Sequence, residues 1–420
     1  MSQSKILLHQ GFEPSARAAH ARLAAVNPHA YAATRNAING AVTRLSPYIT
    51  HGFLSLPEVL QNVHARHPLM PTHKFVYELG WRAYFHHVWE HEGDGIFKSL
   101  HQGPLPDDAY ANTLPADIRQ ARTGIPAIDM AVHTLYATGY LHNHARMWLA
   151  SYIVHVRRVH WRAGADWLFG HLLDGDLASN HLSWQWVAGT GSHKPYLFNA
   201  DNVAKYAPPD WHSPGSCIDV SYEAMEAMAR GGKLPRHAPV SGGIEEPTLS
   251  PKPPTECGFT SPNPDLANGR QVHIIHPWSL GEEADLSTAS VNGNDRHPLA
   301  AAEQHGSDSL TIAVFPLETS ARWPWSPKRW NFVAQAMAAR TPHLWNTDAA
   351  GLAQALRGAT SIKGTQDPHL PAAWRSLQLS PPAAFVPAPE RRCKSFSQYW
   401  KMAAGRFDSV DALLSSADIR

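Results

Sequence analysis

The chain has 420 residues, of which 43% are hydrophobic and 17% charged, which is enough for two globular domains with buried cores. A formal net charge of +1 excludes a strong general attraction to polyanions, so contact with nucleic acid would need a local basic patch. Three widely separated cysteines exclude a four-thiolate cluster, and the absence of a long apolar run or signal peptide predicts a cytoplasmic protein.

Residues 15–206 have a helical pattern. Apolar residues recur there every three to four positions, and Gly93, Gly124, Gly139 and Gly191 interrupt the runs. No long stretch alternates with a period of two. We therefore expect this part of the chain to be all-helical.

The segment VTRLSPYITHGF predicts a helix start, with Ser46 as N-cap and Pro47 in the first helical position. Thr43, Ser46 and unpaired backbone N–H groups would then point into one space. Such an arrangement suits a phosphate, because a helix N-terminus offers free donors and a positive dipole end. An ordinary helix cap is the alternative.

In KFVYELGWRAYFHHVWEH, helical spacing places Glu78, Trp81, Arg82 and Phe85 on one face. An acid, an indole and a guanidinium side by side could line a binding pocket. The alternative is an intrahelical salt bridge from Glu78 to Arg82 on a solvated face.

The next helix, AIDMAVHTLYAT, is expected to end at Gly139. A further helix opens with His142, Asn143, His144, Arg146 and Met147. The two histidines diverge on a helix, and no thiolate or carboxylate set accompanies them, so we predict no metal site.

In the stretch 161–199, Asp174 and Asp176 flank a glycine, Asn180 follows, and Trp184 and Trp186 lie one turn further on. Two aspartates around a glycine alone would indicate a solvated turn or a helix cap. The complete pattern D-G-D-x-A-x-N-x-x-x-W-Q-W is much more specific, and it indicates a binding site.

The remaining chain changes character. Residues 207–270 are rich in Pro, Gly and Ser and predict a linker or surface arm with one short helix, SYEAMEAMAR. Residues 271–375 predict a small α/β domain, with strands in VHIIHP, LTIAVFPLE and ATSIKG and helices in SPKRWNFVAQAMAAR and DAAGLAQALRG. The tail 376–420 is expected to form short helices that pack on this domain.

Together these motifs resemble the photolyase and cryptochrome family over about residues 31–206. The resemblance implies that residues 1–206 form the family's all-helical FAD-binding domain, so the expected fold class is mostly α with a small C-terminal α/β domain. The family's usual N-terminal antenna domain is missing from its place. The α/β segment has a pattern of strands and helices similar to that of the antenna domain, but it follows the helical domain in the sequence instead of preceding it.

The resemblance also implies roles for individual residues. The residues that would hold FAD are Tyr31, Arg35, Thr43, Leu45, Ser46, Arg82, Arg146, Asp174, Asp176 and Asn180. The residues that would line a pocket for a flipped-out pyrimidine dimer are Glu78, Trp81, Asn143, Met147 and Trp186. Trp161 and Trp184 match the inner members of the family's electron-transfer chain; the outer tryptophan is not found, and Tyr110 is the nearest aromatic residue.

The implied function is blue-light-driven repair of ultraviolet-damaged DNA, in which reduced FAD donates an electron to the dimer and takes it back. Val42 replaces a hydroxyl, His144 stands where an arginine is common, and HKPYLFN lacks an arginine near the lesion. The missing arginine, His144 and the displaced antenna domain favour an alternative function. In it the chain is a cryptochrome-like photoreceptor that binds FAD, repairs nothing and signals through a protein partner at the C-terminal domain. A flavoprotein acting on a small molecule is a third reading. The antenna chromophore is left open.

Overall fold

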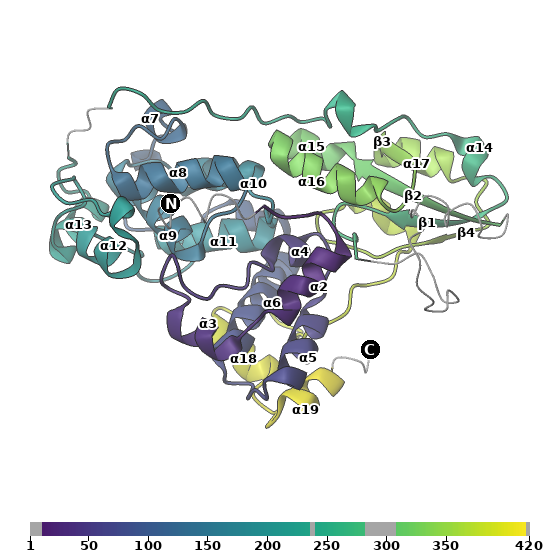
Figure 1. Ribbon diagram of the computed structural model, residues 1–420, viewed down its shortest axis with the longest axis horizontal. Helices are drawn as coiled ribbons and strands as arrows, with labels where there is room; N and C mark the ends of the chain where they lie inside the picture. Colours follow the sequence, from purple (N-terminus) through teal and green to yellow (C-terminus); the bar gives the residue numbers. More distant parts are fainter. Residues whose placement is uncertain (1–10, 236–239, 282–307, 417–420) are drawn as a thin grey trace.

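The computed structural model describes residues 11–235, 240–281 and 308–416 (Figure 1). Its first helices form the lower lobe in Figure 1, where α6 is the longest element. The helices of this lobe are α2 (Ala16–Ala24), α3 (Pro28–Thr34), α4 (Ser46–Thr50), α5 (Leu56–Arg66) and α6 (Lys74–Glu92). Gly93 ends α6 with a φ of 53°, a conformation that favours glycine.

A second group of helices lies beside the first. Its members are α7 (Ala116–Arg119), α8 (Pro126–Thr138), α9 (Asn143–Ser151), the π-helical turn η3 (Tyr152–Val156), α10 (Trp161–His171), α11 (Leu177–Ala188) and α12 (Ala200–Tyr206). Gly139 ends α8 in the left-handed conformation, as the sequence predicted. Short 3-10 turns are η1 (Gly93–Phe97), η2 (Asp107–Ala109), η4 (Pro209–Trp211), η5 (Thr255–Cys257) and η7 (Ala372–Leu377).

The predicted linker is described over residues 207–235 and 240–270. Its first part contains α13 (Tyr222–Ala229), which lies beside α12 and confirms the helix expected there. Its second part is a strap along the top of Figure 1 that leads to α14 (Pro264–Ala267). Glu246 of the strap accepts hydrogen bonds from Arg119 and from Trp167 Nε1, and Ser250 forms a β-bridge with Trp325. The strap is therefore fixed to both the helical part and the α/β part.

The α/β part contains a four-stranded parallel sheet in the order β3-β2-β1-β4. Its elements are β1 (Gln271–Ile275), β2 (Ser309–Pro316), α15 (Leu317–Arg322), α16 (Pro327–Ala338), β3 (Leu344–Thr347), α17 (Ala349–Ala355) and β4 (Ser361–Lys363). The three strands and two helices expected from the sequence are confirmed. The prediction missed β3, whose LWNT sequence is too short to give a clear period.

The fold class is confirmed: the chain is mostly helical and carries a small α/β part near its C-terminal end. The two parts share one hydrophobic cluster, which includes Leu177 of α11 and Phe315 of β2. His51 makes the contact polar as well, with its ring nitrogens 2.6 Å from the Pro277 carbonyl oxygen and 2.8 Å from that of Leu173. Independent domains with the expected boundaries stay a prediction.

The tail helices α18 (Phe396–Ala403) and α19 (Val410–Ser415) pack on α6 and α5. The expectation that they pack on the α/β part was wrong. Gly80 of α6 explains the contact, because a Cβ atom there would lie 2.3 Å from the ring of Trp400. The missing side chain lets the two helices approach closely.

Within the described ranges, every helix is too short or too polar to cross a membrane.

Candidate active site

Helices α6, α9 and α11 carry most of the predicted site residues, and α11 contacts both of the others. The turn between α10 and α11 holds Asp174 and Asp176, which are 6% and 1% exposed. These residues, far apart in the sequence, therefore converge around one turn of the chain.

Each of the two aspartates is paired with an arginine. Arg146 Nη2 donates to both carboxylate oxygens of Asp174, at 2.9 and 2.7 Å. Asp176 Oδ2 accepts from Arg82 at 3.1 Å and from His86 Nε2 at 2.8 Å. Burial alone would raise the pKa of Asp176, but Arg82 and His86 outweigh it and hold the pKa well below its usual value.

Asp176 is also the N-cap of α11, because its Oδ1 accepts from Ser179 N at 2.7 Å. The helix-cap alternative is therefore correct for this residue, whereas the solvated turn is wrong. The same carboxylate caps a helix, pairs with the Arg82 guanidinium and accepts a hydrogen bond from His86, so several contacts hold the turn in place.

Glu78 does not form the intrahelical salt bridge that was the alternative for α6. Its Oε1 accepts from Arg35 Nε at 3.3 Å, while Arg82 reaches across to Asp176. Burial raises the pKa of Glu78, and Arg35 opposes this rise. Tyr31, whose pKa burial raises, lies near Glu78 and Arg35. Tyr31, Arg35 and Glu78 therefore form one group between α3 and α6.

The predicted phosphate-binding segment differs from expectation at its cap. Leu45, not Ser46, is the N-cap of α4, and Thr43 Oγ1 accepts from Leu45 N at 3.3 Å. Arg44 adopts a φ of 52°, which is rare for a residue with a side chain. After this turn the helix begins at Ser46, one residue earlier than the sequence predicted. Thr43, Leu45 and Ser46 lie together, with Ser46 half-buried.

Asn180 lies on α11, where its Nδ2 donates to the Ala165 carbonyl oxygen at 2.8 Å. This bond fixes the orientation of the amide and turns its oxygen away from α10. An oriented amide beside two paired carboxylates offers both donors and acceptors to a ligand.

Trp161 and Trp184 are both 2% exposed and belong to the same hydrophobic cluster. A Cβ atom at Gly164 would lie 2.3 Å from the ring of Trp184, so Trp184 packs directly on the helix that begins with Trp161. Beyond Trp161, His160 lies 5.6 Å away between ring centroids, and Tyr110 lies 6.3 Å from His160. Tyr110 is thus connected to Trp161 through one imidazole ring.

Two tryptophans predicted to line the dimer pocket have different surroundings. Trp81 stacks on Phe396 of α18, with ring centroids 4.2 Å apart and an interplanar angle of 13°. Trp186 is 38% exposed and lies against Tyr196 at 5.8 Å. The tail therefore covers the α6 wall of the pocket.

The α9 residues of the predicted dimer pocket lie close together. Asn143 Nδ2 is 3.7 Å from Met147 Sδ, and Asn143 is exposed. His144, in contrast, is buried, with Nδ1 2.7 Å from the Asn36 carbonyl oxygen and Nε2 3.1 Å from the Tyr196 hydroxyl. His144 is therefore a buried residue that connects α9 to the Asn36 backbone and to Tyr196.

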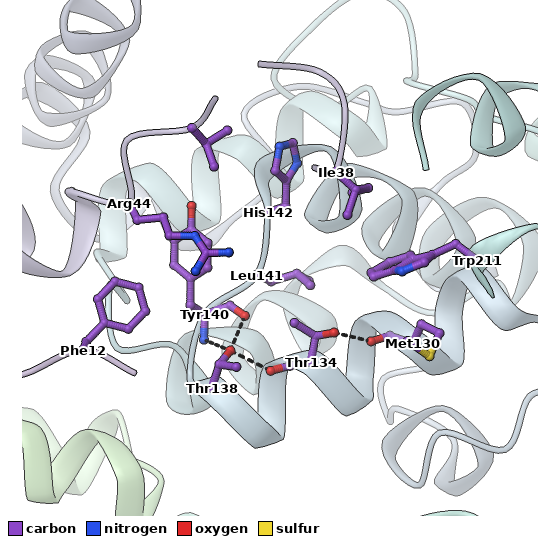
Figure 2. Close-up of a pocket in the computed structure, with 11 residues that line it drawn as sticks. Phe12, Ile38, Arg44, Met130, Thr134, Thr138, Tyr140, Leu141, His142 and Trp211 are labelled. Carbon is purple, nitrogen blue, oxygen red and sulfur yellow. Dashed lines mark hydrogen bonds between the residues drawn. The ribbon is translucent and has the colours of Figure 1, made fainter. Parts of the chain in front are cut away.

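A small cavity is lined in part by Tyr140, and the Arg146 guanidinium lies 5.4 Å from the centroid of the Tyr140 ring (Figure 2). Figure 2 shows Arg44 and Tyr140 at one end of it and Met130 and Trp211 at the other. Its volume of about 30 Å³ suits one water molecule and is far too small for a flavin ring.

Sequence reasoning missed several residues that contact the site. His86 lies one helical turn after Arg82, and this i, i+4 spacing could have revealed it. His369 Nε2 lies 3.7 Å from Asp176 Oδ2, and Arg329 donates to the Gly175 carbonyl oxygen. These two residues come from the α/β part, and no local pattern connects them to the aspartates.

Residues 75–210 match the family model described as the FAD binding domain of DNA photolyase. The match covers α6 to α12 and thus every helix that carries the paired carboxylates. This part of the chain is therefore similar to the FAD-binding domain of DNA photolyase, and the curated proteins that resemble it include photolyases and a cryptochrome DASH.

Among curated relatives, a deoxyribodipyrimidine photo-lyase of Streptomyces griseus is 35% identical over 152 residues, covering 36% of this chain and 33% of its own. A chloroplastic/mitochondrial cryptochrome DASH of Oryza sativa subsp. japonica is 32% identical over 193 residues, covering 43% and 32%. Among solved structures, a Synechocystis sp. PCC6803 cryptochrome aligns with a TM-score of 0.41 and 27% identity, over 46% of this chain and 43% of its own. The chain spans about a third of the length of these two curated relatives.

The residues of the site fit a flavin. Arg146 and Arg82 neutralise the two carboxylates, and the Asn180 amide is held by a backbone carbonyl. Such a set offers acceptors for ring N–H and ribityl hydroxyl groups and donors for ring carbonyls.

Proposed function

We propose that this chain binds FAD between α6, α9 and α11 and uses blue light to drive electron transfer to a pyrimidine dimer in ultraviolet-damaged DNA. The observation that carries the proposal is the pair of neutralised carboxylates, Asp174 with Arg146 and Asp176 with Arg82, inside the matched FAD-binding domain. Relatives named deoxyribodipyrimidine photo-lyase support repair as the leading activity.

The chain's own residues would bind the cofactor and the dimer, orient them and exclude water from them. Bound and reduced FAD would supply an electron to the dimer on excitation and take it back, so the cycle has no net redox change. Tyr31, Arg35, Thr43, Leu45 and Ser46 would hold the cofactor at one end.

At the other end of the cofactor, Asp174, Asp176 and Asn180 would face the flavin ring and ribityl chain. Because Arg146 and Arg82 pair with the two acids, water can be excluded from the site without leaving either carboxylate unpaired. Trp184 and Trp161 would carry electrons inward, since both are buried indoles that pack against one helix.

Glu78, Trp81, Asn143, Met147 and Trp186 would form the dimer pocket, in which an aromatic wall receives an extruded base. Arg35 would hold the Glu78 carboxyl in place. For Trp81 to serve as this wall, Phe396 must first leave its stacked position.

This stacking favours a second candidate function, a cryptochrome-like photoreceptor. Phe396 covers one face of Trp81, which leaves less of the indole open to an extruded base, and α18 is packed closely on α6 at Gly80. In a photoreceptor the tail would stay in place in darkness, and light at the flavin would change its contacts for a protein partner.

The test measures FAD in the purified protein and then follows the base absorbance of ultraviolet-damaged oligothymidine under blue light. Wild type is compared with Phe396→Ala and with Met402→Ala, an exposed position on the same helix. Recovery of absorbance in wild type, or only in Phe396→Ala, supports repair. Bound, photoreducible FAD without recovery in any variant contradicts repair and supports the photoreceptor, whereas a protein without FAD contradicts both.

A further inference from the structure

The C-terminal edge of the parallel sheet is filled by its own side chains. The strand order changes direction between β1 and β4, and in open α/β sheets this point commonly forms a ligand crevice. Here His276 Nε2 donates to the Thr365 carbonyl oxygen at 2.7 Å, and Trp278 stacks on His369 at 4.9 Å with an angle of 7°. Because side chains fill this edge, it does not form an open ligand crevice, and it can instead pack against another part of the chain.

This edge docks at the N-terminus of α11, beside the Asp176 carboxylate. His369 Nε2 accepts from Leu177 N at 3.1 Å, and its Nδ1 lies 2.7 Å from Asp367 Oδ1. The hydrogen bonds assign the proton to Nδ1, which donates to Asp367. His369 thus connects the sheet edge directly to the helix that Asp176 caps.

Arg329 of α16 fills the space behind the same turn, and its exposed fraction is 0%. Nη1 donates to the Phe169 carbonyl oxygen at 3.0 Å, and Nη2 donates to that of Gly175 at 2.6 Å. A Cβ atom at residue 175 would lie 2.3 Å from Nη1. The glycine between the two aspartates therefore leaves room for a guanidinium from the α/β part.

A buried guanidinium is expensive, and this one has carbonyl oxygens and aromatic rings as its described contacts. Burial lowers the pKa of Arg329 to about 9, while Asp174 and Asp176 oppose that change. The side chain stays cationic at neutral pH. A fixed positive charge therefore lies directly behind the turn that presents both acids.

We propose that Arg329 and His369 are positioning residues of the flavin site, so that the site is completed by the α/β part. They hold the turn from Asp174 to Asp176, and the Arg329 charge favours the reduced, more negative flavin and thereby raises its reduction potential. This inference rests on the proposed binding of FAD.

The test compares the FAD content and the reduction potential of wild type with those of Arg329→Met, Arg329→Lys and His369→Gln. Arg357→Met is the matched control, because Arg357 is an exposed arginine of the same α/β part. We expect Arg329→Met to shift the flavin reduction equilibrium about tenfold toward the oxidised form. Arg329→Lys should keep the potential but retain less FAD, since lysine cannot reach both carbonyl oxygens.

His369→Gln should retain less FAD than wild type, because its amide supports α11 less rigidly than the imidazole held by Asp367. Potentials and FAD contents equal to those of Arg357→Met in all three variants would overturn the inference and leave FAD binding intact. Where Arg329→Met is insoluble, the lysine variant decides: unchanged FAD content contradicts the role. Wild type without FAD contradicts the proposed function itself, and this inference with it.

Discussion

The site is built from two regions of the chain that differ in how they contribute. Residues up to Tyr206 supply the carboxylates, their arginines and the tryptophans, all in recognisable patterns. Residues after Gln271 supply what lies against them, namely Arg329 behind Gly175 and Phe396 on Trp81. Motifs thus identify the paired groups of the candidate site, whereas the residues that support and cover these groups come from distant segments.

The largest expected effect compares the two carboxylates. Asp176→Asn keeps an N-cap acceptor for α11 but leaves Arg82 and His86 without a buried anion, so unfolding free energy should fall by about 3 kcal/mol. Asp174→Asn should cost less, about 1 kcal/mol, because Asp174 is paired with Arg146 alone among its described ion-pair partners, whereas Asp176 binds both Arg82 and His86 and caps α11. Urea unfolding of both variants measures the difference, and equal losses would show that the α11 end has no special role.

A smaller effect is expected at the tail. Phe396→Ala removes a half-buried ring stacked on Trp81, which should cost about 2 kcal/mol. Met402→Ala on the same helix should change stability by less than about 0.5 kcal/mol, because Met402 is 53% exposed. Thermal unfolding with tryptophan fluorescence checks both; an unshifted midpoint for Phe396→Ala would contradict a firmly docked tail.

Gly80→Ala tests the helix contact below that ring. Alanine favours helix formation, but its methyl group would overlap the Trp400 ring, so a net loss of about 1 kcal/mol is expected. Pairing it with Trp400→Leu should restore part of the stability, because the smaller side chain leaves room for the methyl group. Denaturant unfolding of the single and double variants measures this coupling, and strict additivity would refute the close contact.

The smallest effect is a pH dependence within the helical region. Burial, together with His144 and Arg146, lowers the pKa of His142 to about 3 from an ordinary 6.5. The unfolded chain then binds the proton more tightly, so stability is lost as pH falls from 6.5 toward 3, by about 0.7 kcal/mol between pH 7 and pH 6. His142→Asn keeps a capping acceptor for α9 and should reduce this slope; an unchanged slope would contradict the assignment.

Local patterns predicted a large share of the fold. The α8 terminus at Gly139, the helix α13 and strands β1, β2 and β4 follow from periodicity and turn residues alone. β3 was missed because four residues give no clear period. The docking of α18 was mispredicted because its partner surface, around Gly80, lies more than 300 positions earlier in the chain.

The site was predictable only as residue types. The sequence indicated that Glu78 and Arg82 share a face of α6 but not that each pairs with a different element. It left open whether Asp176 is a cap or a buried site residue, and both descriptions hold. His369 and Arg329 had no signal, because contacts across 150 or more positions depend on how the two parts dock.

The Arg329 contact with Gly175 also has a consequence for synthesis. The two residues are 154 positions apart. At a synthesis rate of about 5 to 20 residues per second, Arg329 is therefore added to the chain roughly 8 to 30 s after Gly175. During that interval the helices are already outside the ribosome, and the acids lack the charge behind them. The proposed flavin site would therefore be among the last parts of the molecule to form, and cofactor binding should follow release of the α/β part from the ribosome.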